Sequence, residues 1–187
     1  INRSVNDPTV PPDYFTNPRN SAIGPYIGQF HTNLFRCPSD MEVKERVRAW
    51  QSNPTGPNPY LYSYSLPSYI GSQGNHGLGS LYQRGQPPEH FRVNRVKNPT
   101  DKIMLVDENA SDKHHNSVID DGRWVPPGNV LTARHQFSPG QSVDPETFWQ
   151  KGKAVVVFVE GHVETVNPDF GRQREHYDPL YDALGSQ

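Results

Sequence analysis

The stretch Ala154–Val166, Ala-Val-Val-Val-Phe-Val-Glu-Gly-His-Val-Glu-Thr-Val, decides the fold of this chain. It is the longest apolar run and is rich in β-branched residues, which favour strands. Glu160-Gly161 interrupts it once, and two residues ending in glycine between two such runs predict a tight hairpin turn. The first arm, residues 155–159, is apolar on both faces and is therefore predicted to be a buried central strand. The second arm alternates in polarity and is predicted to be a more exposed neighbouring strand.

Length and composition restrict the fold class. A chain of 187 residues is most simply one domain, long enough to bury a sizeable core. Its 19 Pro and 15 Gly are too many turn-forming residues for a helix bundle, and its 9 Tyr, 8 Phe and 3 Trp are too many aromatic residues for a disordered chain. We therefore predict an α+β fold with a central antiparallel β-sheet, one short helix and long Pro/Gly-rich loops.

Charge and cysteine content exclude some classes of partner and of covalent structure. The formal net charge is −2, so no basic field is available to collect phosphate groups and nucleic acid is not expected as a partner. The single cysteine, Cys37, has no internal disulfide partner. We expect Cys37 to be a small buried hydrophobic residue. A nucleophilic role would need a partner histidine, to which the sequence does not point.

The remaining elements are predicted from shorter patterns. Ser39 followed by Glu42 has the spacing of a capping box, and apolar residues recur behind it at helical intervals. Alternating or continuous apolar runs predict the strands. The predicted elements are a helix over residues 40–51 and strands over residues 60–66, 91–96 and 102–107.

Three regions outside these elements have their own character. Residues 1–30 contain several prolines and are predicted to form an extended arm with turns. The polar segment 108–129 is too long for a simple connection and is expected to be an insertion with a binding or packing role. A further polar insertion follows His135 and continues to Lys153. Residues 170–187 form a tail with enough aromatic and aliphatic side chains to dock on a surface, but with a weak helical pattern.

Several short segments together resemble a known family. They are, in order, Phe-Arg-Cys-Pro-Ser-Asp at 35–40, a Tyr/Ser-rich strand, Val-Lys-Asn-Pro-Thr-Asp-Lys-Ile-Met-Leu-Val-Asp-Glu at 96–108, Arg134-His135, and Val-Phe-Val-Glu-Gly-His-Val at 157–163. Over roughly residues 24–166 they resemble the soluble region of type IV pilin-like proteins, specifically the bacterial type II secretion pseudopilin-like group. That group typically has Asp where Glu160 stands, and a shorter spacer after its Arg-His.

The resemblance implies a non-enzymatic structural role. Residues 1–187 would form one pilin-like head domain of a secreted or cell-surface protein. It would belong to an extracellular filament, pseudopilus or surface assembly, with copies of itself and other pilin-like subunits as partners. We assign the arm and the tail to those contacts. The family's long apolar N-terminal helix is not among these residues, so the chain is expected to be a head-domain fragment or a relative that assembles differently.

Polar residues at the ends of two predicted strands suggest a metal site. Strands 103–107 and 155–159 are expected in one sheet, and their carboxyl ends carry Asp107-Glu108 and Glu160, with two histidines nearby. Imidazole nitrogen with carboxylate oxygen suits zinc, whereas oxygen-only sets suit calcium. The candidate ligands are Asp107, Glu108, His135 and His162. The alternative is a polar network in which both histidines bond the carboxylates, with Arg134 paired to Asp107 or Glu108.

Two other functions are compatible with the sequence. A metal-dependent hydrolase would use Asp107, His135 and His162, although neither Gly-x-Ser-x-Gly nor His-Glu-x-x-His occurs. A surface module that binds glycans or other ligands is suggested by Trp124 and Trp149 in predicted loops. The pair His114-His115 is expected to be solvated loop.

Overall fold

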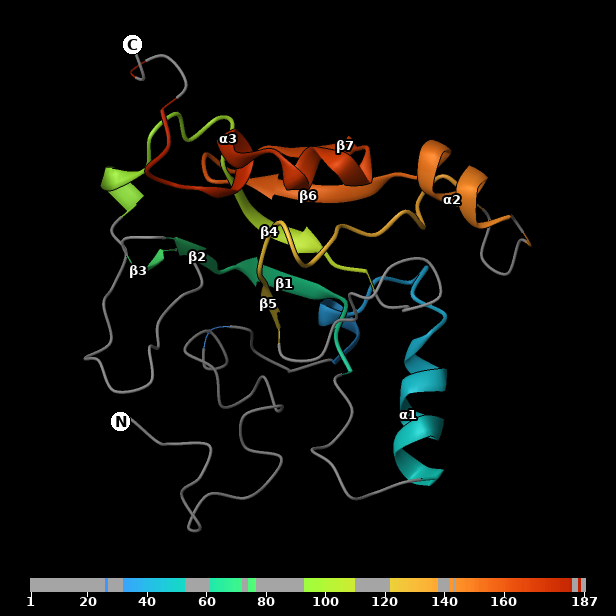
Figure 1. The fold of residues 1–187 in the computed structure, drawn as a ribbon. Coiled ribbons are helices and arrows are strands. Elements are labelled where there is room, and N and C mark those ends of the chain that lie inside the picture. Colours follow the sequence, from blue (N-terminus) through green and yellow to red (C-terminus); the bar gives the residue numbers. More distant parts are fainter. Residues whose placement is uncertain are drawn as a thin grey trace, which may run out of the picture.

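The computed structural model describes residues 26, 32–52, 61–71, 74–76, 93–109, 122–137, 142, 144–182 and 185. The arm 1–30, except Tyr26, therefore lies outside the described residues, and so does the pair 114–115. Within them the chain has an α+β fold, with a five-stranded sheet in the order β5-β1-β4-β6-β7, a separate two-stranded sheet and three short α-helices (Figure 1). None of these helices is long and apolar enough to cross a bilayer.

The predicted hairpin is present as β6 (Ala154–Phe158) and β7 (Val163–Val166), which pair antiparallel. Alternate residues of β6 are buried and the two between them are half-buried, so the predicted burial on both faces is only partly present. The first three residues of β7 are exposed, as expected of a more exposed neighbouring strand. The predicted two-residue turn is wrong by one residue. The N–H of Phe158 donates to the carbonyl of His162, so three residues form the loop, and Gly161 has φ +101°. Such loops often end in a residue with positive φ, which glycine adopts without a steric penalty.

The strand predicted over residues 102–107 is also present, as β4 (Ile103–Asp107), which pairs antiparallel with β6. On its other side lies β1 (Tyr64–Pro67), again antiparallel. The sheet as a whole is mixed, because β5 (Arg123–Trp124) pairs parallel to β1. The prediction of a purely antiparallel sheet is wrong at this edge. The sequence gives no sign of β5, because a two-residue strand is too short to show a period.

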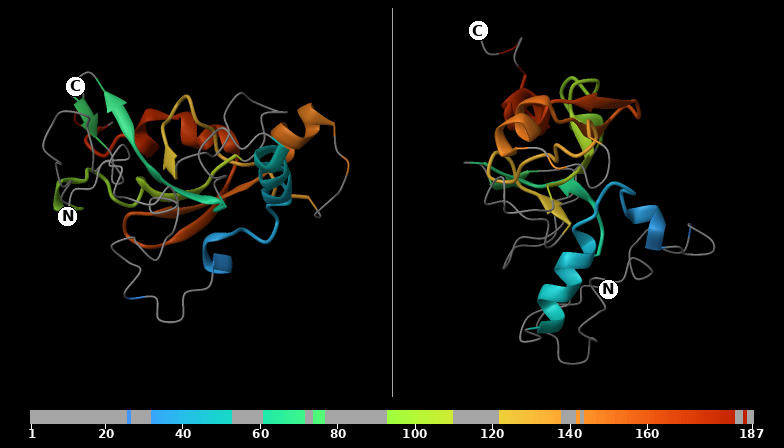
Figure 2. Two further views of the ribbon diagram at one scale, coloured as in Figure 1. Left: turned by 90° about the horizontal axis from the view of Figure 1, so that it is seen from below. Right: turned by 90° about the vertical axis from the view of Figure 1, so that its right-hand side faces the viewer.

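The helices differ from the single predicted one. α1 (Val43–Ser52) begins three residues later than the predicted residue 40. Residues 41 and 42 form a turn before it, in which the N–H of Met41 donates to the carbonyl of Ser39. The axis of α1 points away from the sheet in Figure 1 and in the right-hand view of Figure 2. α2 (Pro145–Lys151) and α3 (Arg174–Tyr177) were not predicted. The remaining elements are 3₁₀ turns, η3 (Thr32–Phe35), η4 (Val93–Arg95) and η5 (Pro168–Arg172), and the strands β2 (Tyr69–Gly71) and β3 (Gly74–His76).

The prediction of a strand over residues 91–96 is wrong. Its described part, from Val93, forms η4 and then a turn. Two β-favouring valines flank Asn94-Arg95, and no neighbouring strand is present to pair with them among the described residues. Strand propensity reflects packing on a sheet more than a backbone preference, so these valines alone do not make a strand.

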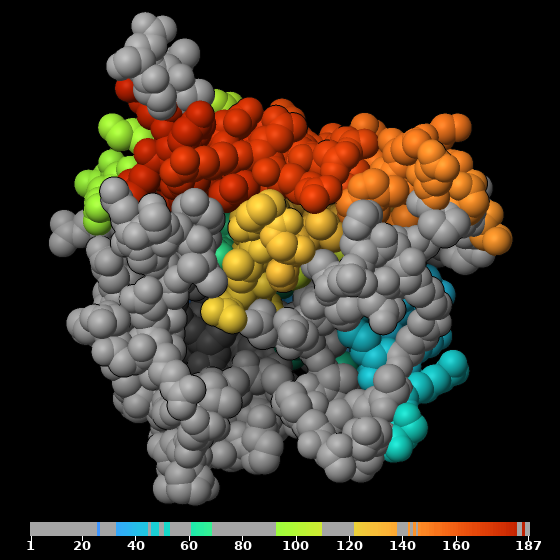
Figure 3. Space-filling view, viewed as in Figure 1, coloured from blue at the N-terminus to red at the C-terminus, as the bar shows by residue number. Residues whose placement is uncertain are grey.

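The core lies on the face of the sheet that the C-terminal segment covers. Trp124 is fully buried there, and its indole N–H donates to the carbonyl of Asn129 at 3.0 Å. In Figure 3 the C-terminal segment, in red, lies against the gold segment 122–137, and Gly171 packs on Trp124 and Leu131. The other core side chains are Ile103, Val106, Ala154, Val156, Phe158, Val166 and Tyr177, with Phe170 packed against them.

This packing bears on two expectations. The tail, as far as it is described, docks on its own sheet, so its buried side chains such as Tyr177 are not available to another copy. Trp124, expected on a recognition surface, is a core residue and is not available to a ligand. Trp149 lies half-buried on α2.

Candidate functional site

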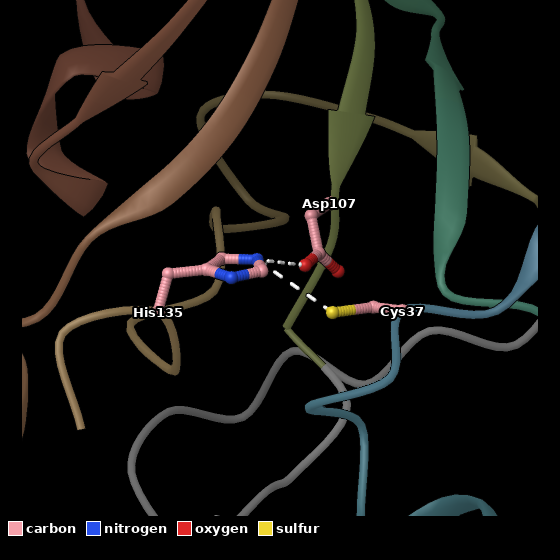
Figure 4. A group of neighbouring side chains, drawn as sticks. All are labelled: Cys37, Asp107 and His135. Carbon is pink, nitrogen blue, oxygen red and sulfur yellow. Dashed lines mark hydrogen bonds and ion pairs between the residues drawn. The ribbon is translucent and has the colours of Figure 1, made fainter. Parts of the chain in front are cut away.

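Three side chains from distant parts of the chain meet at one end of the sheet (Figure 4). Cys37 lies in the turn before α1, Asp107 is the last residue of β4, and His135 lies in the segment between β5 and α2. The His135 Nε2 atom is 2.5 Å from Asp107 Oδ2 and 3.7 Å from Cys37 Sγ. All three ligand atoms lie within 4.8 Å of one another. Cys37 and Asp107 are buried, and 20% of the His135 side chain is exposed.

Backbone pairing fixes the position of this group. The N–H of His135 donates to the carbonyl of Lys153 at 3.1 Å, which ties the histidine to the start of β6. The N–H of Thr132 donates to the carbonyl of Asp107 at 3.0 Å, which ties the same segment to the end of β4. Because β4 and β6 are antiparallel, the end of one strand and the start of the other lie together. The segment 131–135 therefore brings its side chains to that end of the sheet.

A buried ionic network extends from this group to α1. The Arg134 guanidinium lies between two carboxylates, with Nη1 3.2 Å from Asp40 Oδ1 and Nη2 3.3 Å from Asp107 Oδ1. The same guanidinium donates to the carbonyl of Glu108 at 2.5 Å. Asp40 also pairs with Arg46 at 2.9 Å and accepts from the Ser63 hydroxyl at 2.7 Å. The predicted pairing of Arg134 with Asp107 is confirmed.

The electrostatics of the network favour the charged forms of Asp40 and Arg134. Burial acts to raise the pKa of Asp40, but the charges of Arg134 and Arg46 and the hydrogen bonds from Arg46 and Ser63 prevail, so this pKa is lowered. Burial acts to lower the pKa of Arg134, but Asp107 and Asp40 prevail and raise it. Each charge is thus favoured by a partner of opposite sign, which is the condition under which buried charges are tolerated.

His135 is the titratable member of the group. Its hydrogen bonds, first to Asp107 and then to Cys37, raise its pKa to about 9 against the opposing effect of burial. The imidazole therefore carries a proton at neutral pH and donates from Nε2 to the Asp107 carboxylate. Beside it, burial and the charges of Cys37 and Asp107 raise the pKa of Tyr64 to about 12, so the phenol is neutral. The site favours positive charge and disfavours further negative charge.

The four predicted ligands do not form one group. Asp107 and His135 meet, but a carboxylate oxygen of Glu108 accepts from the Asn129 side chain at 2.6 Å. His162 lies at the opposite end of β6, a strand that spans roughly 15 Å. There its ring stacks on Phe158 and contacts Glu160 at 2.7 Å and Glu164 at 3.4 Å. The carboxyl ends of antiparallel neighbours point in opposite directions, and this explains the separation.

Cys37 is the member of the site that sequence reasoning missed. It was expected to be a buried hydrophobic residue, and it is indeed 3% exposed. Its partner histidine, His135, lies far along the chain, and no spacing or motif in the sequence connects the two. Only the backbone pairing of the segment after β5 brings them together.

The geometry defines which chemistry the group supports. In a nucleophile–histidine–aspartate relay, the nucleophile meets one ring nitrogen and the carboxylate orients the other. Here Cys37 and Asp107 both contact Nε2 of His135. The carboxylate therefore competes for the atom that would take the thiol proton. This arrangement suits ion pairing or coordination of a cation better than nucleophilic catalysis.

Comparison of the chain with protein-family models, with curated proteins and with solved structures finds no match.

Proposed function

We propose that this chain is a non-enzymatic structural subunit of an extracellular filament, pseudopilus or surface assembly. Its partners would be copies of itself and other pilin-like subunits, and its place would be outside the cell or at the cell surface. The observation that carries the proposal is the convergence of the segments on which the resemblance rests. Residues 35–40, the end of 96–108 and Arg134-His135 meet in one buried network, and 157–163 contains the hairpin turn.

This convergence matters because short matches scattered over a surface would carry little meaning. The matching segments instead supply the contacts between the α1 region, the end of β4 and the segment before β6. Removing one member of a buried charge pair costs about 3–5 kcal/mol. The resemblance thus concerns the residues that hold the head together, which supports a shared structural role.

The relation of Cys37 and Asp107 to His135 supports the non-enzymatic part of the proposal. Both contact a single nitrogen, so the histidine is used as a positively charged tie between two buried groups. Such a tie fixes the position of segments. It does not leave the imidazole free to exchange protons with a bound substrate.

The edge strand β7 is the described surface best suited to contact another copy. It ends the five-stranded sheet, and no described strand pairs along its outer edge. Val163 is 59% exposed there, beside the exposed carboxylates of Glu160 and Glu164. An open strand edge can bind a strand of another chain through backbone hydrogen bonds. The two carboxylates favour a partner surface that carries Lys or Arg.

The test is assembly of the purified protein, alone and with pilin-like subunits, followed by sedimentation and electron microscopy. We expect polymers or regular assemblies, and we expect Val163→Lys to reduce them at least tenfold while the monomer stays folded. Val93→Lys is the matched control, because Val93 is 63% exposed on η4, away from the sheet edge. A discrete monomer under all these conditions, or one that cleaves a substrate, would contradict the proposal.

A further inference from the structure

We propose that Cys37, Asp107 and His135 form a binding site for one divalent transition-metal ion of the zinc class. Their ligand atoms are Sγ, Oδ2 and Nε2, supplied by three separate segments of the chain. This inference does not depend on the proposed function, because a metal at this place would stabilise the domain whatever the domain does.

The separations of the ligand atoms are close to those of a tetrahedral site. With Zn–S of about 2.3 Å and Zn–N and Zn–O of about 2.1 Å, tetrahedral ligands lie roughly 3.4–3.6 Å apart. The observed distance from Cys37 Sγ to His135 Nε2 is 3.7 Å, which fits directly. The distance from Nε2 to Asp107 Oδ2 is 2.5 Å and would have to open by about 0.9 Å. The His135 side chain is partly exposed, so rotation of the imidazole about its side-chain bonds can open this distance while the backbone stays tied to Lys153.

A shared nitrogen is the second argument. Nε2 of an imidazole has either one N–H or one lone pair, so it makes one well-directed hydrogen bond. Here it faces two groups, the thiol of Cys37 and the carboxylate of Asp107. A cation placed between the three atoms would satisfy all of them at once.

Groups around the ligands hold them in place. The second carboxylate oxygen of Asp107 lies 3.3 Å from the Arg134 guanidinium, which limits rotation of the carboxylate. The backbone of His135 is tied to Lys153, and that of Asp107 to Thr132. Contacts of this kind orient metal ligands and contribute to affinity.

The ligand set selects the class of metal. A thiolate with one imidazole and one carboxylate favours zinc and cobalt, whereas calcium and magnesium prefer sets of oxygen atoms. Of the two ions considered from the sequence, zinc therefore fits this group and calcium does not. Three protein ligands leave one position of a tetrahedron, which water can occupy. The exposed part of His135 gives an ion access from solvent.

The first experiment measures binding of Zn²⁺ and Co²⁺ to reduced, chelator-treated protein by calorimetry and absorption spectroscopy. We expect one ion per chain and, for Co²⁺, a thiolate charge-transfer band. Cys37→Ser and His135→Gln should each lower the affinity at least tenfold, and Cys37→Ser should abolish the band. His162→Gln is the control, because His162 also lies between carboxylates but outside the proposed site. The affinity of this variant for the metal ion should equal that of the wild-type protein. Equal affinity in wild type and Cys37→Ser, or binding lost only in His162→Gln, would overturn the proposal.

A second measurement uses the wild-type chain alone, in case a variant does not fold. Cys37 is the only cysteine, so its rate of alkylation reports on this site without interference. We expect stoichiometric Zn²⁺ to slow alkylation at least tenfold, and a chelator to restore the original rate. Magnesium ions at the same concentration should have no effect. A rate that does not respond to Zn²⁺ would contradict the site independently of any substitution.

Discussion

Arg134 Nη1 lies 3.2 Å from Asp40 Oδ1 and so joins the segment before α1 to the segment before β6. Both side chains are buried, and Arg134 also contacts Asp107. A surface pair of this kind contributes about 0–1 kcal/mol, but breaking a buried pair leaves an unpaired charge and costs several times more. The position of α1 relative to the sheet therefore depends on this arginine.

Replacing Arg134 with Met should destabilise the protein strongly. The change leaves Asp40 and Asp107 buried with one cation fewer, so we expect a loss of about 3–5 kcal/mol in the free energy of unfolding. Urea denaturation, followed by tryptophan fluorescence, measures it. Arg172→Met is the control, because Arg172 and its partner Asp169 are about half exposed, and its effect should stay below about 0.5 kcal/mol. Equal effects of the two substitutions would show that the buried network does not stabilise the fold.

The stability of metal-free protein should fall between pH 6.5 and about 9. The pKa of His135 is raised from 6.5 to about 9 in the folded state, first by its hydrogen bond to Asp107. A raised pKa gives stabilisation that is complete below pH 6.5 and is lost as the pH rises through the folded value. The facing groups are the Asp107 carboxylate and the Cys37 thiol, with Arg134 behind Asp107.

We expect this loss to be on the order of 2 kcal/mol. Urea denaturation across the pH range in the presence of a chelator measures it. The control is His135→Gln, whose stability should change less over the same window. If wild type and variant show the same pH profile, the histidine is not protonated by its pairing with Asp107.

Gly152→Ala should displace His135. A Cβ added at Gly152 would lie 2.4 Å from the Cβ of Ala133, from its carbonyl oxygen and from the carbonyl oxygen of Phe148. These separations are shorter than van der Waals contact. The backbone there has an ordinary φ of −65°, so the effect is steric and not conformational. We expect a loss of about 1–3 kcal/mol or more, because backbone atoms cannot move aside as a flexible side chain can.

Thermal unfolding of Gly152→Ala, together with the chemical shifts of the His135 ring, measures both effects. Gly128→Ala is the matched control, because the nearest neighbour of its added Cβ would be the carbonyl of Val125 at 3.5 Å, an ordinary contact. We expect little change for this variant in either measurement. An unaltered His135 signal in Gly152→Ala would show that the histidine is positioned by other contacts.

Gly161→Val should destabilise the hairpin. Gly161 has φ +101°, a region that branched side chains rarely adopt, although there is open space around it. We expect a loss of about 1–3 kcal/mol from backbone strain alone. Unfolding by urea measures it, with Glu160→Val as the control in the same exposed turn. If both variants lose the same stability, exposure of valine and not the dihedral angle is responsible.

The sheet was predictable where the sequence contains long runs. β4 has four consecutive apolar residues and β6 has five, and the alternating polarity of β7 indicated that this strand is more exposed. The three-residue turn was not distinguished from a two-residue turn, because Val159 is apolar and resembles a strand residue. β5 was missed because a strand of two residues is too short to show a period, although Trp124 in it is fully buried. Longer elements were therefore predicted more accurately, because more residues contribute to their hydrophobic pattern.

One missed helix did have a signal. Asp144-Pro145 before α2 is an N-cap residue followed by proline in the first turn, and the Asp144 side chain accepts from the N–H of Thr147 at 2.9 Å. The surrounding polar residues concealed the pattern. α3 has only four residues and depends on packing of Tyr177 into the core, which no local pattern records.

The candidate site was half predictable. Asp107 and His135 were identified as polar residues near strand ends, and they do meet. His162 was grouped with them because strand direction was not known, and an antiparallel pair places it at the far end. Cys37 was missed because its contact with His135 depends on tertiary structure alone. Local chemistry thus indicated which residue types mattered, and topology decided which of them share a site.

The order in which the chain is made gives the Asp40–Arg134 contact a further consequence. Translation proceeds at about 5–20 residues per second, so Asp40 leaves the ribosome roughly 5–20 seconds before Arg134 does. During that interval the Arg134 guanidinium is not available to pair with the Asp40 carboxylate. The hydrated carboxylate is therefore favoured over the buried one. The region around α1 would then dock late, after the centre of the sheet has emerged. A nascent chain halted before Arg134 should leave that region open to proteases and chaperones.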